Sequence, residues 1–357
     1  MDFLSYLQEA GAKRGPSGHE DEISAWLAER FRPLCDQVDI DPMFNVIAVK
    51  KATKTGKKPV PRVLLCAHQD EIALMVSDIL PDGTLRMGQV GGVDPRILPA
   101  STVTVHGTGK PGEMNKLTGI IGAMPPHLLD EAERKQNYKR EDLFVDLGLP
   151  VEKVRSLVNI GDLITLHGEA VELLNRRAAG KTMDDRACVG ILLDIAERMQ
   201  GMAHEADLYF ACTSQEEVGS RGARAAAYTV DPHMAVVLDV SHAPIPQSKP
   251  DSTIPLDAPA ASYGPFVQHR LLDRLKATAA RHGVKLNTEH AEGATHTDAD
   301  NVQIAREGVP CVLLSLPLKY MHTTVELLDM NAMAECGRLI AHFLAELTQG
   351  WEDELWN

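Results

Sequence analysis

The sequence predicts an α/β fold in which helices cover both faces of a mixed, largely parallel sheet, with a small β-barrel-like domain inserted into the chain. Short apolar runs with clear ends recur along the sequence, as buried parallel strands do. Amphipathic helical segments alternate with these runs in the first part and in the last half of the chain, which is typical of a helix-covered sheet. The middle holds short β-like pieces separated by glycine and proline, which indicates a separate β domain.

Each predicted element rests on its own pattern. Residues 19–31 (HEDEISAWLAERF) have helical periodicity, and residues 62–70 (RVLLCAHQD) form a buried strand that ends in polar residues. After the middle region, residues 185–200 form an amphipathic helix. The remaining expected strands are residues 207–213, 234–240 and 311–317, and the remaining expected helices are residues 266–283 and 329–347.

The middle region defines the predicted domain boundaries. Residues 72–168 form the inserted domain, so the larger domain is discontinuous and comprises residues 1–71 and 169–357. The β-like pieces of the insert are LRMGQVGG, STVTVHG, LTGIIGA and DLITLHG. One charged stretch, residues 128–144, interrupts them and is expected to be helical.

Composition excludes several classes of function. The net charge of −14 argues against binding to nucleic acid or to an anionic membrane, because both need a basic protein surface. No apolar run approaches the roughly 20 residues of a membrane-spanning helix, and the N-terminal residues lack the pattern of a secretory signal. The 6 cysteines include no CxxC pair. We therefore expect a cytoplasmic protein without disulfides or a thiolate zinc site.

Carboxylates and imidazoles stand at the ends of the predicted strands, where open α/β sheets bind their ligands. The segment TSQEEVGSRG, residues 213–222, places two glutamates side by side directly after a predicted buried strand. Adjacent like charges in such a place are unfavourable unless water or cations surround them. The residues at these strand ends and at the start of the helix at 185–200 are His68, Asp70, Asp184, Asp185, Glu216, Glu217, Asp239 and His322.

Each of these residues also has an ordinary structural explanation. A histidine near a strand end is commonly hydrogen-bonded or exposed, and the pair Asp184–Asp185 can cap the helix that follows it. Adjacent glutamates can form a solvated turn. The convergence of all these groups on one edge of the sheet is harder to explain by packing, and it favours a site that binds cations.

Histidines and carboxylates without thiolates suit zinc, cobalt or manganese. One bridging carboxylate, with an imidazole and an acid for each metal, makes a two-metal hydrolase centre whose ions share a water. A further carboxylate would accept the proton of that water and pass it to the leaving group. One of Glu216 and Glu217 would bind a metal and the other would be the base. The residues alone leave open which glutamate has which role.

The order of five motifs resembles one family. AHQDEIALMV, GKTMDDRACVGILL, TSQEEVGSRGA, VLDVSHA and KYMHTTVE are similar to segments of the cytosolic dinuclear metallo-aminopeptidases that assemble as tetrahedral dodecamers. That family includes glutamyl, leucyl and lysyl aminopeptidases and proteins labelled as endoglucanases. The resemblance spans nearly the whole chain. It implies a catalytic domain at residues 1–71 and 169–357 and a dimerisation domain at residues 72–168.

The resemblance also implies a role for each candidate residue. Two divalent ions per subunit, zinc or cobalt with manganese as an alternative, would be held by His68, Asp184 and Asp239 at one site and by Asp184, Glu217 and His322 at the other. Asp184 would bridge the two ions, and Glu216 would be the general base. Asp70 would bind the far nitrogen of His68 and fix its tautomer.

Two further residues are candidates of lesser weight. His296 stands where the family tends to have a small residue, and it is expected to be a pocket residue, an extra ligand or a polar loop residue. Asp298 is a candidate for substrate contact, or equally an N-cap for the helix that follows it.

The resemblance implies an aminopeptidase that acts on short peptides. The first alternative is a related metallo-carboxypeptidase or deacylase, whose insert usually comes later in the chain and whose site needs a cation for the substrate carboxylate. The second is a catalytically silent assembly subunit that keeps the fold. All expected ligand positions are filled here, which favours the active enzyme.

Overall fold

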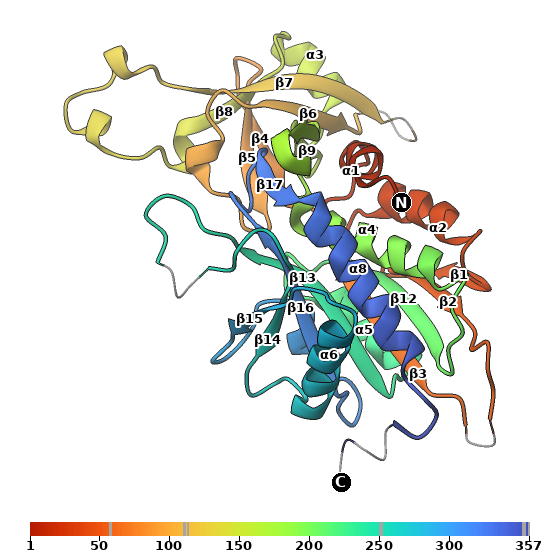
Figure 1. Cartoon of the computed structure of the whole chain (residues 1–357). Coiled ribbons are helices and arrows are strands. Elements are labelled where there is room, and N and C mark those ends of the chain that lie inside the picture. Colours follow the sequence, from red (N-terminus) through yellow and green to blue (C-terminus); the bar gives the residue numbers. More distant parts are fainter. Residues whose placement is uncertain (57–58, 110–111, 113, 250–252, 352–354, 356–357) are drawn as a thin grey trace. The chain divides into compact units, whose positions relative to one another are not determined.

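The structure is a computed structural model that describes residues 1–56, 59–109, 112, 114–249, 253–351 and 355. The chain divides into two compact units (Figure 1). The first comprises Met1–Asp70, Glu169–Met321 and Val325–Asn357. The second comprises Glu71–Gly168 and His322–Thr324.

An eight-stranded sheet forms the centre of the first unit, with the strand order β1-β2-β12-β3-β13-β16-β14-β15. The central strands β12, β3, β13 and β16 run parallel to one another. Antiparallel pairs join β2 to β12 and β14 to β16. The strands are β1 (Gln37–Ile40), β2 (Val46–Lys50), β3 (Arg62–His68), β12 (Asp207–Thr213), β13 (Met234–His242), β14 (Ala260–Tyr263), β15 (Asn287–His290) and β16 (Cys311–Leu318).

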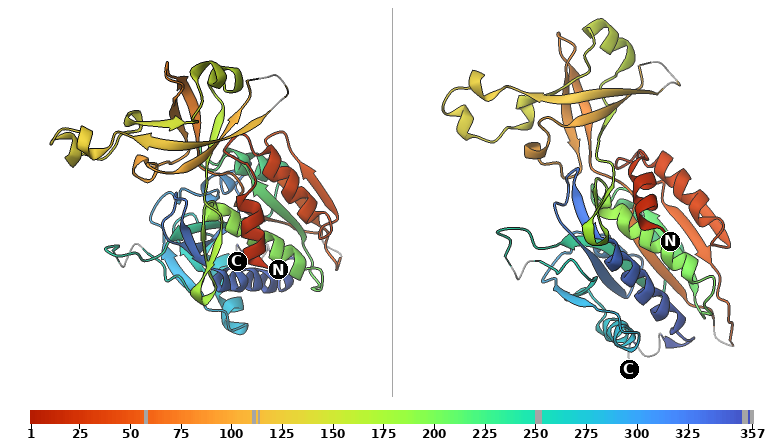
Figure 2. Two further views of the ribbon diagram at one scale, coloured as in Figure 1. Left: turned by 90° about the horizontal axis from the view of Figure 1, so that it is seen from above. Right: turned by 45° about the horizontal axis from the view of Figure 1, so that its top comes forward.

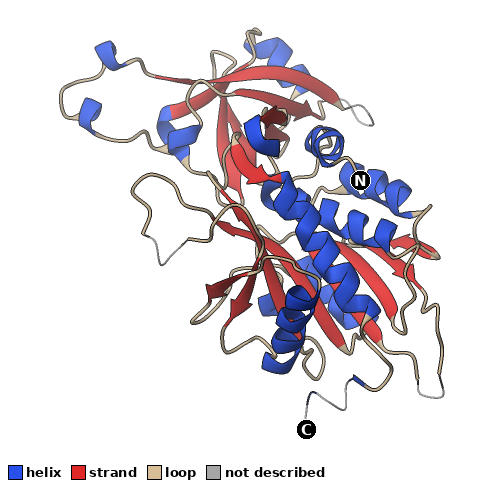
Figure 3. Ribbon diagram, viewed as in Figure 1, coloured by secondary structure: helices blue, strands red, loops and turns tan. Residues whose placement is uncertain are grey.

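Both faces of the central strands are buried. In β3, Val63 and Leu65 pack into one hydrophobic cluster, whereas Leu64 and Cys66 pack into another. A strand covered on both faces needs a continuous apolar run, because its successive side chains point to opposite sides. Helices lie along the sheet (Figure 3). The first cluster contains residues of α1, α2, α4, α6 and α8, and the second contains residues of α5 and α7.

Helices α1 and α2 lie beside α4, and α4 also packs against α8 (Figure 2). The helices of this unit are α1 (Phe3–Gly11), α2 (Asp21–Phe31), α4 (Met183–Arg198), α5 (Arg221–Val230), α6 (His269–Arg281), α7 (Ala299–Val302) and α8 (Met330–Ala345). A small antiparallel sheet, β10-β11-β17, completes it. Its strands are β10 (Val171–Leu173), β11 (Arg177–Gly180) and β17 (Glu326–Asp329).

The second unit is a closed six-stranded barrel with the order β4-β5-β8-β7-β6-β9. Neighbouring strands in it are antiparallel. It has its own apolar core, which includes Leu74, Val103 and Ile164. The elements are β4 (Ala73–Ile79), β5 (Leu85–Val90), β6 (Thr102–Gly107), β7 (Asn115–Ala123), β8 (Leu143–Asp146), α3 (Val151–Leu157) and β9 (Leu163–Leu166).

The predicted fold class is confirmed, since a largely parallel, helix-covered sheet is joined to a small barrel. The expected helix at residues 128–144 is wrong. Short 3-10 turns occur there, at Pro126–Leu128, Glu133–Lys135 and Arg140–Asp142, and the last two residues of the stretch begin strand β8. The stretch lacks an apolar stripe to pack against the barrel, and short helices without such packing are marginal in water. Among the described residues, every helix is too short or too polar to cross a membrane.

Candidate metal centre

His68 is the last residue of β3 and is almost completely buried. Strand β3 lies between β12 and β13 in the middle of the sheet. The backbone amide of His68 donates a hydrogen bond to Oδ2 of Asp185 over 3.2 Å. A histidine that closes a central parallel strand is therefore delivered to the edge where such sheets bind ligands.

Asp184 lies at the start of α4, where the backbone is not yet helical. Its φ and ψ angles are −77° and 106°, and Asp185 also departs from helical geometry. The peptide bond between these two residues is cis. Glu326 of β17 accepts a hydrogen bond from the amide of Asp184 over 3.2 Å. With this extended backbone, Oδ1 of Asp184 lies 3.0 Å from Nε2 of His68. The pair Asp184–Asp185 therefore does more than cap a helix.

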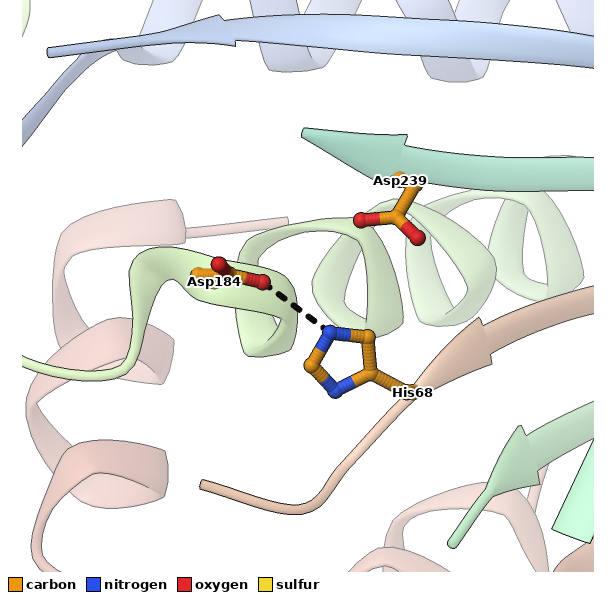
Figure 4. A group of neighbouring side chains, drawn as sticks. All are labelled: His68, Asp184 and Asp239. Atoms are coloured by element: carbon orange, nitrogen blue, oxygen red, sulfur yellow. Dashed lines mark hydrogen bonds and ion pairs between the residues drawn. The ribbon is translucent and has the colours of Figure 1, made fainter. Parts of the chain in front are cut away.

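Asp239 comes from β13 and completes a group of three ligand-type residues. Ligand atoms of His68, Asp184 and Asp239 all lie within 4.8 Å of one another, and all three residues are buried. Figure 4 shows the imidazole and the two carboxylates at the corners of a triangle, with each side chain supplied by a different element. One imidazole and two carboxylates at this spacing fit a divalent cation such as zinc, cobalt or manganese.

The electrostatics of this group also fit a cation. Burial and the neighbouring carboxylates of Asp185, Glu216 and Asp184 raise the pKa of Asp239 well above its ordinary value, although His68 lowers it. Burial alone would lower the pKa of His68, but its contacts with Asp184 and Asp70 raise it well above the usual range. Several carboxylates thus lie close to one imidazole and repel one another. A bound cation would offset the repulsion between these carboxylates.

Asp70 lies on the other side of the imidazole. Its Oδ1 atom is 3.4 Å from Nδ1 of His68, and the Asp70 side chain is fully buried. Burial raises the pKa of Asp70, but the adjacent imidazole of His68 and the hydrogen bond from Ser17 outweigh it, so the pKa is lowered. An anionic Asp70 favours the His68 tautomer with a proton on Nδ1, in which Nε2 can bind a metal.

The two adjacent glutamates stand in a turn after β12 that Asp70 also holds. The amides of Glu216 and Glu217 donate to Asp70 over 3.0 Å and 3.3 Å. Gln215, just before them, has a positive φ of 57°. This turn frees the two side chains from the strict alternation of a strand.

The carboxylate of Glu216 reaches the three-residue group. Its Oε2 atom lies 4.0 Å from Nε2 of His68, and its Oε1 atom accepts a hydrogen bond from Ser220 over 3.1 Å. Burial, together with the charges of Asp298 and Glu217, raises the pKa of Glu216 to about 8, although His68 lowers it. A carboxylate with its pKa near neutrality can both accept and release a proton.

His322 belongs to the second unit, in its short segment His322–Thr324. Its Nδ1 atom lies 3.0 Å from the carbonyl oxygen of Gly92 in the same unit. A carbonyl can only accept, so Nδ1 carries the proton and Nε2 carries the lone pair that a metal would need.

Asp298 and His296 occupy different environments. Asp298 is 1% exposed and its carboxylate accepts a hydrogen bond from the hydroxyl of Thr213. It precedes α7 without capping the helix through its side chain. This hydrogen bond joins Asp298 to Thr213 at the end of β12. His296 is exposed, has a positive φ of 56°, and donates its amide to Asp300.

The sequence pattern missed two buried residues beside the turn, Ser17 and Glu20. Ser17 donates to Asp70 over 2.6 Å, and Glu20 accepts from the amide of Gln215 over 3.0 Å. No motif marks them, because Glu20 is one of several charges at the start of an amphipathic helix.

Comparison with known proteins identifies the family of the chain. The family model described as M42 glutamyl aminopeptidase matches residues 45–339. The chain belongs to the peptidase M42 family. It is therefore a peptidase of the aminopeptidase class, as the motifs predicted. The lysyl aminopeptidase of Pyrococcus furiosus is 32% identical over 338 residues, which cover 93% of this chain and 94% of that protein.

Solved structures extend the M42 relationship to the fold. A TET aminopeptidase from a marine sediment archaeon, Thaumarchaeota archaeon SCGC AB-539-E09, has a TM-score of 0.91 and 30% identity, covering 99% of this chain and 98% of that one. The TET1 peptidase of Pyrococcus horikoshii, described as able to assemble into a tetrahedron or a large octahedral shell, has a TM-score of 0.81 and 27% identity. That match covers 97% of this chain and 100% of the other.

Proposed function

We propose that this M42 peptidase removes N-terminal residues from short peptides with the help of two divalent cations. The observation that carries the proposal is the buried group of His68, Asp184 and Asp239, with the carboxylate of Glu216 4.0 Å from the same imidazole. A cation-binding group with an adjacent carboxylate of raised pKa is the arrangement that metal-assisted hydrolysis needs.

The ligand assignment follows from these positions and from the family resemblance. His68, Asp184 and Asp239 would hold one ion, and Asp184, Glu217 and His322 would hold the other. The Nδ1–H tautomer of His322 supports its role as a ligand through Nε2. Zinc or cobalt is expected, with manganese as the alternative.

The reaction is peptide-bond hydrolysis. When bound, the cations would polarise the scissile carbonyl and lower the pKa of the attacking water. Glu216 accepts a proton from that water as the new C–O bond forms at the carbonyl carbon. The C–N bond then breaks, and Glu216 passes the proton to the leaving amine nitrogen. Asp70 holds His68 in the required tautomer and holds the amide of Glu216 in place.

Assembly into a closed particle would restrict access to short, unfolded peptides, which suits an exopeptidase of the cytoplasm. A particle with tetrahedral rotational symmetry contains about twelve equivalent subunits, and closed symmetry prevents open filaments. The barrel exposes apolar side chains at Ile120, Met124 and Leu128. Exposed apolar patches commonly mark interfaces, so the inserted barrel is the proposed dimer contact and the catalytic units make the larger contacts.

The test is a panel of aminoacyl-anilides with acidic, basic and apolar residues, each with a free and an acetylated amino group. The proposal predicts that metal-loaded protein cleaves only the free-amine substrates and that chelation abolishes this cleavage. Cleavage of the acetylated substrates would support a deacylase instead. No cleavage of either set by protein with both metals bound would support a silent assembly subunit.

A further inference from the structure

We propose that Ser17 and Glu20 are positioning residues for the catalytic turn at residues 215–217. They come from the loop before α2, far from the turn in sequence, and both are buried. The inference rests on the proposed role of Glu216 as the general base. It adds that the position of this base is set by a loop outside residues 45–339, the part of the chain that the family model matches.

Glu20 ties the loop directly to the turn. Its Oε1 atom accepts one hydrogen bond from the amide of Gly18 over 2.8 Å and another from the amide of Gln215 over 3.0 Å. Gln215 is the residue before Glu216, and its left-handed backbone has to be held against its intrinsic preference. One buried oxygen therefore fixes both the loop and the residue at which the chain turns.

The position of Glu20 in the chain makes this use of its carboxylate unusual. It is the N-cap residue of α2, where a side chain ordinarily accepts from the first amides of its own helix. Glu20 makes no such bond. Its Oε2 atom is buried and, within the part of the chain that the structure describes, has no hydrogen-bond partner. The buried carboxylate of Glu20 therefore binds the distant amide of Gln215 instead of capping its own helix.

Ser17 reaches the same turn through Asp70. Its hydroxyl donates to Oδ2 of Asp70 over 2.6 Å, and that same oxygen accepts the amide of Glu217 over 3.3 Å. The other oxygen, Oδ1, accepts the amide of Glu216 over 3.0 Å. Asp70 therefore accepts hydrogen bonds from both the loop and the turn, and it links the two.

The loop itself is well supported. Gly18 has a φ of +82°, which lets the chain reverse between Ser17 and Glu20. The amide of His19 donates to the carbonyl of Pro16 over 2.8 Å, and Arg14 donates to the carbonyl of His19 over 3.2 Å. A loop closed by its own hydrogen bonds can act as a rigid support for a catalytic group.

The consequence concerns turnover more than binding. If the turn moves, the Glu216 carboxylate no longer lies where it can take the proton. A displacement of about 1 Å can cost about 100-fold in rate, and a general base contributes roughly 10²–10⁴-fold. Loss of the Glu20 support should lower kcat by about tenfold or more and leave KM within about twofold.

The experiment compares Glu20→Met with Glu20→Gln, using the full chain loaded with cobalt at saturation. Methionine keeps the length of the side chain but removes the acceptor, whereas glutamine keeps an oxygen for the amides of Gly18 and Gln215. Glu20→Met is expected to lose about tenfold or more in kcat per metal-loaded protein. Glu20→Gln is expected to keep at least about half of wild-type kcat.

Ser17→Ala gives a second, smaller test if Glu20→Met does not fold, and it is expected to lower kcat severalfold. The matched control is Asp21→Asn, which removes the ion pair from Arg14 to a half-exposed side chain in the same region without touching the turn. It should leave kcat unchanged. A merely structural role would lower the melting temperature in both Glu20 variants without the rescue by glutamine.

Wild-type kcat in folded Glu20→Met, or in Ser17→Ala where the methionine variant does not fold, would overturn the inference. Equal loss of kcat in Glu20→Met and Glu20→Gln would also overturn it. Glu216→Gln is measured in the same series to separate this failure from failure of the proposed function. An inactive Glu216→Gln beside a fully active Glu20→Met rejects only the positioning role, whereas an active Glu216→Gln rejects the base itself.

Discussion

Nε2 of His68 lies 3.0 Å from Oδ1 of Asp184, although the two residues are 116 positions apart in the sequence. The contact joins the end of a central strand to the non-helical start of α4. Both groups are buried among further carboxylates, and a cation shared by the imidazole and the carboxylate would offset the repulsion between those acids.

Asp184→Asn tests the bridging assignment. An amide is a weaker ligand than a carboxylate and carries no charge, so we expect loss of both ions and loss of peptide turnover. Metal analysis after gel filtration, together with an aminoacyl-anilide assay, measures the two effects. Two retained ions with normal turnover would show that Asp184 does not bridge them.

Asp70→Asn should weaken metal binding without removing a ligand. The asparagine amide cannot stabilise the required tautomer of His68 as a carboxylate does, and loss of such a partner typically costs roughly 10–100-fold in metal affinity. Competition with a chelator of known affinity measures the change. Unchanged affinity would mean that the 3.4 Å contact between His68 and Asp70 does not tune the ligand.

The metal-free protein should lose stability as the pH rises. Burial, above all, raises the pKa of Glu216 to about 8 and that of Asp298 to about 6 in the folded protein, above their unfolded values. A carboxyl with a raised folded pKa binds more protons in the native state, so its stabilising effect is lost between the unfolded and the folded pKa.

Thermal unfolding of chelated protein should therefore show a melting temperature that falls between about pH 5 and pH 8. Added cobalt should remove most of this slope, because a cation replaces the protons. A melting temperature of the chelated protein that rises over the same range would contradict the charges assigned to the site.

Ile120→Glu tests the proposed dimer contact of the barrel. The Ile120 side chain is 56% exposed, so a charge there should leave the barrel folded but break an apolar interface. We expect light scattering to show a smaller particle than the wild type. Ile160→Glu is the matched control, because Ile160 is 67% exposed in the same unit and lies outside the proposed patch. A particle of unchanged size in Ile120→Glu would reject the contact.

The predicted fold class followed from local patterns that tertiary structure did not override. The run at residues 62–70 became β3, because apolar residues on both faces of a strand are stable only inside a covered sheet. The helix expected at residues 128–144 failed for the opposite reason, since its residues have helical propensity but no apolar face. The small sheet formed by β10, β11 and β17 was missed because its strands are short and partly exposed.

The candidate site was visible in the sequence only in part. Strand ends placed His68, Asp239 and the two glutamates on one edge by topology alone. Glu20 carried no such signal, because its partner Gln215 is 195 residues away and its neighbours are ordinary helix-surface charges. Contacts between distant loops depend on how the whole chain packs, and local periodicity does not record them.

Glu216→Gln and Glu217→Gln, measured side by side for bound metal and for turnover, distinguish the general base from the metal ligand. We expect Glu216→Gln to keep two ions per subunit and to lose roughly 10²–10⁴-fold in kcat, because a base supplies no metal bond. We expect Glu217→Gln to lose one ion. The reverse pattern, with metal lost from Glu216→Gln and kept in Glu217→Gln, would contradict the assignment of base and ligand.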